Sequence, residues 1–201
     1  MIYLIFSSIE FLLWFLPIFL IVYGITPHKY RNLTLLIGSI VFYAMGDAGN
    51  LAPLMISILC NYFIGLHLAK RSPRTLWRKR LLFVTALSIN IGILIWFKCR
   101  GGSAGLPLGI SFYTFQLIAY LVDTYRAKCE DQTFFEYLQF MCFFPRFLQG
   151  PIVLQEDFIP QLRAENRSIL SYDHLGRGLY SFALGLGKKV LLADSLAKIV
   201  S

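Results

Sequence analysis

Four polar side chains recur within an otherwise apolar stretch near the middle of the chain: Tyr113, Gln116, Tyr120 and Asp123. Spacings of three, four and three residues place them on one face of a helix. Polar groups inside membrane spans are costly, so they are candidates for function. The face could line a wet pocket, or it could supply hydrogen bonds between packed helices. We also expect Asp123 to pair with Arg126, three residues further on.

A second group of chemically useful residues lies at 145–151, where two prolines bracket Arg146, Gln149 and Gly150. Proline lacks an N–H and disfavours helix at the residue before it. Irregular backbone at membrane depth is tolerated only where protein buries it or where it lines a cavity. The element is either the floor of a wet site or a surface loop. We expect Arg146 to face water or an anionic group of a substrate, and not lipid.

The histidines and cysteines form no recognisable site. No histidine has a serine or cysteine partner at a catalytic spacing, and the cysteines are widely separated, without a metal-binding or disulfide pattern. We therefore expect no metal, no disulfide framework and no catalytic residue among them; these residues are His28, His67, His174, Cys60, Cys99, Cys129 and Cys142.

Composition places all of these residues in a membrane protein. The 201 residues are 57% hydrophobic and only 15% charged, whereas about a quarter of the residues in a soluble domain are charged. An ordinary soluble enzyme, a disordered chain and a secreted disulfide scaffold are thereby excluded. The net charge is +8, but the basic residues sit in short loops between apolar runs, so nucleic acid is not an expected partner.

Seven apolar segments predict an all-α, polytopic transmembrane bundle. The segment at 134–144 is too short to span and is expected to be re-entrant or interfacial. The first segment, interrupted by Glu10 and Pro17, is expected to be a retained span and not a signal peptide. Because the chain stops inside an apolar stretch, we expect the N-terminal portion of a longer protein. The segments are 2–25, 33–45, 51–69, 81–97, 106–122, 134–144 and the stretch from 176 onward.

Loop charge predicts the orientation of the segments. The loop at residues 70–80 holds six basic residues, which places it in the cytoplasm and the N-terminus outside. Lys98 and Arg100 then face outward. Small and polar residues at helical spacing predict close packing between the third and fourth segments; they are Ser57, Asn61, Gly65, Ser88, Asn90 and Gly92.

Three ordered blocks within residues 106–200 resemble the membrane-bound O-acyltransferase (MBOAT) family, and its alginate O-acetyltransferase-like branch most. The first is LGISFYTFQ at 108–116, continuing to Asp123 and Arg126. The second is FFPR at 143–146, with QGPI at 149–152 and DFIPQL at 157–162. The third, at 178–197, includes GLGKKV at 185–190. Residues 1–105 are similar to the family only in general character.

The resemblance implies that residues 1–201 are the N-terminal part of one MBOAT domain in the cell inner membrane. It implies transfer of an acyl group, with acetyl expected for this branch, from a donor such as acetyl-CoA or an acyl-carrier thioester. The acceptor would be a hydroxyl of a cell-surface or exported polysaccharide, with periplasmic or extracellular acyltransferases as partner proteins and no bound cofactor. The family's catalytic histidine is expected beyond Ser201, so this stretch alone should be inactive.

Pocket contributors expected on this basis are Gln116, Tyr120, Asp123, Arg146 and Gln149, in lining and orienting roles. Three alternatives stay open. The D-alanyl transfer branch for teichoic acid shares the FFP and GPI elements. A transporter would also use broken helices and intramembrane polar groups, although no inverted repeat is visible. A non-catalytic membrane assembly subunit is the third.

Overall fold

A computed structural model of the chain describes residue 8 and residues 10–69, 76–100, 107–126, 132–147, 150, 153–164, 172–193 and 195–196. Regular structure in these residues is helical throughout, without a strand, which confirms the all-α fold. The helices group into two compact units. The described part of the first covers residues 28–163, and the second combines residues up to 27 with those from 164 onward.

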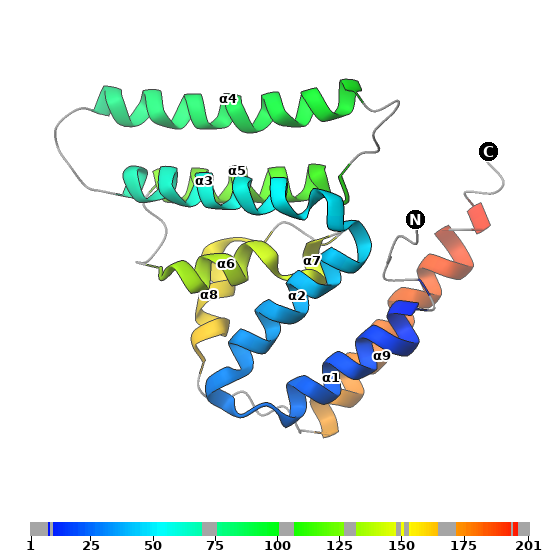
Figure 1. Ribbon diagram of the computed structural model, residues 1–201. Helices are drawn as coiled ribbons and strands as arrows, with labels where there is room; N and C mark the ends of the chain where they lie inside the picture. The colour runs from blue at the N-terminus through cyan, green and yellow to red at the C-terminus, as the bar shows by residue number, and fades with distance from the viewer. Residues whose placement is uncertain are drawn as a thin grey trace. The chain divides into compact units, whose positions relative to one another are not determined.

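The first unit is built around three helices that run alongside one another (Figure 1). Helix α5 packs against both α3 and α4, and α2 contacts α6 and α7. Helix α8 packs on α6. The bounds are α2 Arg31–Asp47, α3 Leu51–Ala69, α4 Leu76–Arg100, α5 Ile110–Tyr125, α6 Phe134–Cys142, α7 Phe144–Phe147 and α8 Gln155–Arg163.

The second unit contains α1 (Leu16–Ile25) and α9 (Tyr172–Gly187), each extended by a π-helical stretch, at Phe11–Phe15 and Lys188–Ala193. The expected interruption at Pro17 is absent, since Pro17 lies in the first turn of α1. Proline cannot donate to the carbonyl four residues earlier, and the wider π-helical turn before it lets the helix continue. Helix α9 begins before the expected start at residue 176.

Some helix ends differ from those predicted from hydropathy, because charged residues or prolines near the ends were read as loop. Helix α3 matches the predicted 51–69, and α2 extends the predicted 33–45 at both ends. Helix α4 begins at Leu76, well before the predicted start at 81, and includes Arg78, Lys79 and Arg80. Lys and Arg are good helix formers, so the charges belong to the helix. Residues 70–75 of this basic segment lie outside the described residues.

The beginning of α5 is fixed by local backbone chemistry. Its predicted start was residue 106, but the helix starts at Ile110, after Pro107 and after Gly109 at φ 71°. A left-handed conformation of this kind favours glycine. The Leu108 N–H donates to Asp47 Oδ2 at 2.9 Å. The turn between α2 and α3 therefore lies beside the start of α5.

The segment at 134–151 is not one straight helix, as predicted. Helix α6 has nine residues, too few to cross about 30 Å of hydrocarbon. Phe143 is the C-cap of α6. The next residue, Phe144, begins the short α7, and α8 then packs back on α6. Helix α8 was not predicted, because Pro160 and the polar residues around it hide its buried face of Gln155, Ile159 and Leu162.

Helices α3 and α4 are joined by a buried pair of amides. Asn90 Nδ2 donates to Asn61 Oδ1 at 2.9 Å, and Asn61 Nδ2 donates to Asn90 Oδ1 at 3.2 Å. Each amide also donates within its own helix, to Ser57 O and Ala86 O. Both side chains are buried. This confirms the predicted close packing between the two segments, since a reciprocal pair leaves neither amide unsatisfied in an apolar surrounding.

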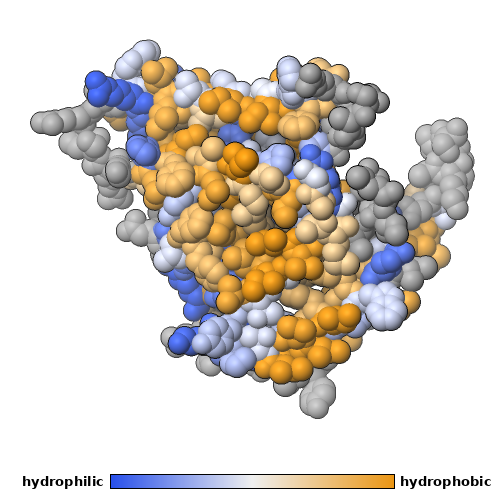
Figure 2. Space-filling view, in the orientation of Figure 1, coloured by the Kyte–Doolittle hydropathy of each residue, from blue (hydrophilic) through white to orange (hydrophobic). Residues whose placement is uncertain are grey.

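Much of the outer surface is apolar. Figure 2 shows hydrophobic side chains over broad areas of the visible face. In the described part of the chain, two helical stretches are long and apolar enough to cross a membrane, His28–Ala69 and Leu76–Cys99. Large side chains such as Ile89, Ile95 and Trp96 stay exposed on α4. Water would oppose exposure on this scale, whereas lipid does not.

Gly65 provides the first test of the packing. A Cβ at this position would overlap the Tyr120 ring, with Cζ only 2.6 Å away. We expect Gly65→Ala to lower the free energy of unfolding by about 1–3 kcal/mol, the usual cost of overpacking. Gly92→Ala is the matched control, because no atom lies within 4 Å of its added Cβ. Thermal midpoints in detergent measure both variants, and equal midpoints would contradict the contact.

Candidate functional site

The polar face of α5 is confirmed as a single buried face. Tyr113, Tyr120 and Asp123 are buried, and Gln116 is half-buried. The face points into the first unit, since Leu117 and Leu121 between these residues belong to its hydrophobic core. Exposed Phe112 and Phe115 lie on the opposite side of α5. The helical spacing therefore identified correctly which side of α5 is covered by protein.

Amide side chains tie this face to the chain beyond Gly150. Gln116 Nε2 donates to the Val153 carbonyl at 3.1 Å. Gln155 Nε2 donates to the Tyr120 carbonyl at 3.5 Å, and Gln132 Nε2 donates to Gln155 Oε1. Gln155 is 1% exposed. Sequence reasoning missed Gln155, although a glutamine directly after the apolar run 152–154 was a usable signal.

Aromatic rings pack around the centre of α5. The Tyr120 and Tyr137 rings lie 4.6 Å apart between centroids, and Tyr62 lies 5.1 Å from Tyr137. The Tyr137 hydroxyl donates to the Ile58 carbonyl at 2.8 Å, which satisfies a polar atom in an otherwise apolar core. Tyr120 is thus held between α3 and α6. Its ring fills space and its hydroxyl meets Gly65.

Asp47 is a buried carboxylate that sequence reasoning did not select. It accepts from Asn50 Nδ2 at 2.9–3.0 Å and from the Leu108 N–H. The residue is 7% exposed, so these donors replace the water that an ionised carboxylate requires. Its role in the structure is to hold the turn between α2 and α3 against the start of α5. An acidic residue among Gly and Asn in a short turn gave only a weak signal.

Arg146 is half-buried, and its guanidinium lies among aromatic rings of the protein; that it faces water or an anionic group of a substrate stays a prediction. Its guanidinium carbon is 4.8, 5.5 and 4.7 Å from the ring centroids of Phe140, Phe143 and Phe158. Nη2 donates to the Phe140 carbonyl. Nε and Nη1 are buried without a hydrogen-bond partner in the described part of the chain.

Gly150 belongs to the same turn. Its N–H donates to the Arg146 carbonyl at 3.0 Å, and a Cβ at this position would overlap Arg146. Only glycine permits so close an approach of the two backbones, which agrees with the tight path expected here. Gln149, the remaining predicted pocket residue, lies outside the described residues. Asp123 is buried, and the predicted ion pair with Arg126 is not formed in the structure, which describes both residues.

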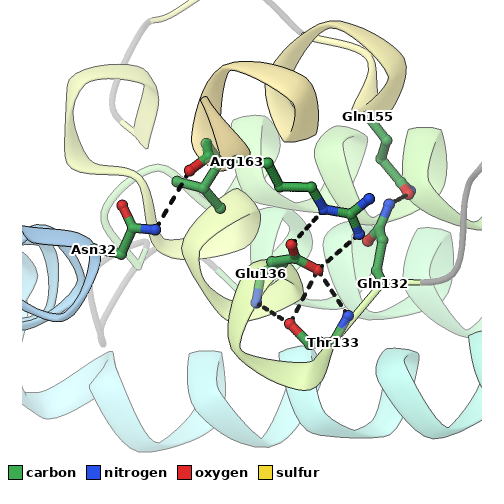
Figure 3. A network of polar contacts seen from close by, with 7 residues as sticks. Asn32, Gln132, Thr133, Glu136, Gln155 and Arg163 are labelled. Carbon is green, nitrogen blue, oxygen red and sulfur yellow. Dashed lines mark hydrogen bonds and ion pairs between the residues drawn. The ribbon is translucent and has the colours of Figure 1, made fainter. Parts of the chain in front are cut away.

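Figure 3 shows the polar contacts that hold α6 against α8. Thr133 caps α6 through a reciprocal pair of bonds with Glu136. Arg163 Nε donates to Glu136 Oε1 at 2.6 Å. The hydrogen bond from Arg163 is the largest cause that lowers the pKa of Glu136 to about 2, so the carboxylate stays ionised. Asn32 Nδ2 donates to the Leu162 carbonyl at 3.4 Å and connects α2 to the same pair of helices.

The side chains assembled here are amides, phenols and the carboxylate of Asp123. Amide and phenol groups can hold hydroxyl and carbonyl oxygens. His28 and His67 are exposed, and His67 Nδ1 contacts its own helix at Phe63 O, 2.8 Å away. Among the described residues, no group of histidine, cysteine and carboxylate side chains could hold a metal ion.

Comparison with known proteins gives consistent matches. Residues 35–201 match the model of the MBOAT, membrane-bound O-acyltransferase family. The "Probable alginate O-acetylase AlgI" of Pseudomonas fluorescens is 34% identical, over 98% of this chain and 40% of the relative. The protein of the same name from Pseudomonas aeruginosa is 31% identical, over 98% and 41%. A "Peptidoglycan O-acetyltransferase" of Helicobacter pylori is 31% identical, over 96% and 45%.

The chain therefore spans less than half the length of these relatives. No solved structure matches. The matched region 35–201 includes the polar face of α5 and the whole element from α6 to α8.

Arg146 allows a test of whether the site lowers the free energy of unfolding of the protein. Nε and Nη1 of Arg146 are buried without a hydrogen-bond partner among the described residues, which is destabilising, and an apolar residue of similar length is often better tolerated. We expect Arg146→Met to raise the free energy of unfolding by about 1–2 kcal/mol, measured as a higher thermal midpoint in detergent. A lower midpoint would show that the ring contacts and the bond to Phe140 outweigh the cost of burial, and that Arg146 is a structural residue.

Proposed function

Because the chain belongs to the membrane-bound O-acyltransferase family, we propose that it is part of an enzyme that acetylates hydroxyl groups of a cell-surface or exported polysaccharide. The observation that carries the proposal is the family match over 35–201, which contains the buried polar face of α5. The named relatives act on alginate or peptidoglycan through O-acetylation. Both names describe acetyl transfer, so D-alanyl transfer, transport and a purely structural role are not favoured.

The chemistry would be activation of an acceptor hydroxyl by a general base, followed by attack on a thioester carbonyl. The donor would be acetyl-CoA or an acyl-carrier thioester, used as a co-substrate. Gln116, Tyr120 and Asp123 would line and orient the reacting groups, and Arg146 and Gln149 would do so from the 145–151 turn. None of these residues takes the proton. That step would fall to a histidine outside residues 1–201.

The protein is a membrane protein, as its family and its apolar helices indicate. We place it in the cell inner membrane as a multi-pass protein, with the basic segment at 70–80 on the cytoplasmic side. A donor made in the cytoplasm and an acceptor outside it would then meet across the helical bundle. Periplasmic or extracellular acyltransferases would be its partner proteins.

Asp123 tests the proposed site. The carboxylate is 8% exposed, and the loss of a buried hydrogen-bonding group costs about 1–3 kcal/mol. We expect Asp123→Ala in the full-length protein to lower acetyl transfer by at least about tenfold. The assay follows labelled acetyl from donor to polysaccharide at matched expression in membranes.

Asp131→Ala is the control, because it removes a carboxylate eight positions along the chain from the polar face. It should transfer acetyl groups at the rate of the unmodified protein. Equal effects of the two substitutions would mean that the α5 face has no special role. An unmodified full-length protein that transfers no acetyl group to any polysaccharide would contradict the proposed function itself.

A further inference from the structure

The end of the first unit where α4 begins and α5 finishes carries uncompensated positive charge. Arg78 and Arg80 are exposed near the start of α4, Lys79 is half-buried, and Arg126 is exposed directly after α5. From residue 48 to residue 122 the sequence contains no Asp or Glu. In the described part of the chain, these four side chains form no ion pair.

Contacts between the two helices bring these charges together. Lys79 Nζ lies 5.3 Å from the centroid of the Tyr125 ring, and the Phe83 ring stacks on Tyr125 at 4.4 Å. The ends of α4 and α5 are therefore adjacent, as Figure 1 shows along the whole pair. The carboxylate nearest to Arg126 among the described residues of α5 is Asp123, which is buried. Among the described residues no carboxylate pairs with these cations, so they are available to an anion from the surroundings.

Apolar side chains in the first turn of α4 indicate what kind of anion would bind to these cations. Leu76 is 86% exposed and Trp77 is 71% exposed. Tryptophan favours the boundary between headgroups and hydrocarbon, where its ring meets both environments. Clusters of Lys and Arg at the end of a membrane helix attract anionic lipids. A free phosphate ion would satisfy the cations but would leave Leu76 and Trp77 without apolar contact.

We propose that this surface, formed by Leu76, Trp77, Arg78, Lys79, Arg80 and Arg126, binds the headgroups of anionic phospholipids. The phosphate would contact the arginines, and the upper part of the acyl chains would cover Trp77 and Leu76. The proposal does not depend on the acyl-transfer function. It makes stability depend on lipid headgroup charge at one end of α4.

The test uses the full-length protein in a neutral detergent, titrated with phosphatidylglycerol while its thermal midpoint is recorded. We expect phosphatidylglycerol to raise the midpoint and phosphatidylcholine to leave it unchanged. The double variant Arg78→Gln, Arg80→Gln should need about 25-fold more phosphatidylglycerol for half the shift, since each cation near a membrane surface contributes roughly fivefold. Lys79 is kept because it packs on Tyr125.

The matched control, Lys98→Gln with Arg100→Gln, removes the same charge from the other end of α4 and should respond like the unmodified protein. Equal losses in the two double variants would overturn the site in favour of net charge alone. Inorganic phosphate that reproduces the shift would overturn the lipid assignment in favour of a simple anion. An equal shift with phosphatidylcholine would exclude recognition of headgroup charge.

Discussion

The contact of Tyr120 with Gly65 is the constraint on which the first unit depends. An added Cβ on Gly65 would overlap the Tyr120 ring, so α3 and α5 can approach this closely only because one partner lacks a side chain. The approach lets Tyr120 reach Tyr137 on α6. It also leaves the carbonyl of Tyr120 within reach of Gln155 on α8. Tyr120 and Gly65 thus bring α5 into contact with three neighbours, α3, α6 and α8.

Neutral amides carry most of the polar connections inside this unit. Asn61 pairs with Asn90, Gln116 reaches Val153, and Gln155 reaches Tyr120. Amides can satisfy both donors and acceptors without the desolvation penalty of a charge. Arg146 departs from this pattern, because it places a cation among three phenylalanine rings, and two of its nitrogens have no hydrogen-bond partner among the described residues. A cost of this kind is typical of residues retained for function and not for stability.

The sequence was informative wherever periodicity decides the structure. The face of α5, the bounds of α3 and the break after α6 all follow from apolar spacing and from proline. The sequence was less informative where the role of a residue depends on a partner that is distant in the chain. Gln155 and Asp47 gain their importance from Tyr120 and Leu108, which are distant in the chain. The ring surroundings of Arg146 could not be predicted, because Phe158 comes from α8, a helix that Pro160 concealed.

If Gln116, Tyr120 and Asp123 orient the acyl donor, as we propose, the donor should bind beside the α5 face and near Val153. A photoreactive benzoyl-phenylalanine at Val153, whose carbonyl meets Gln116, tests it in the full-length protein with radiolabelled acetyl-CoA. Position 115 on the outer side of α5, where Phe115 is 48% exposed, is the control. The account predicts labelling at 153 that unlabelled coenzyme A competes away, and none at 115. Equal labelling at both positions, or none at 153 in a variant that still transfers acetyl groups, would contradict it.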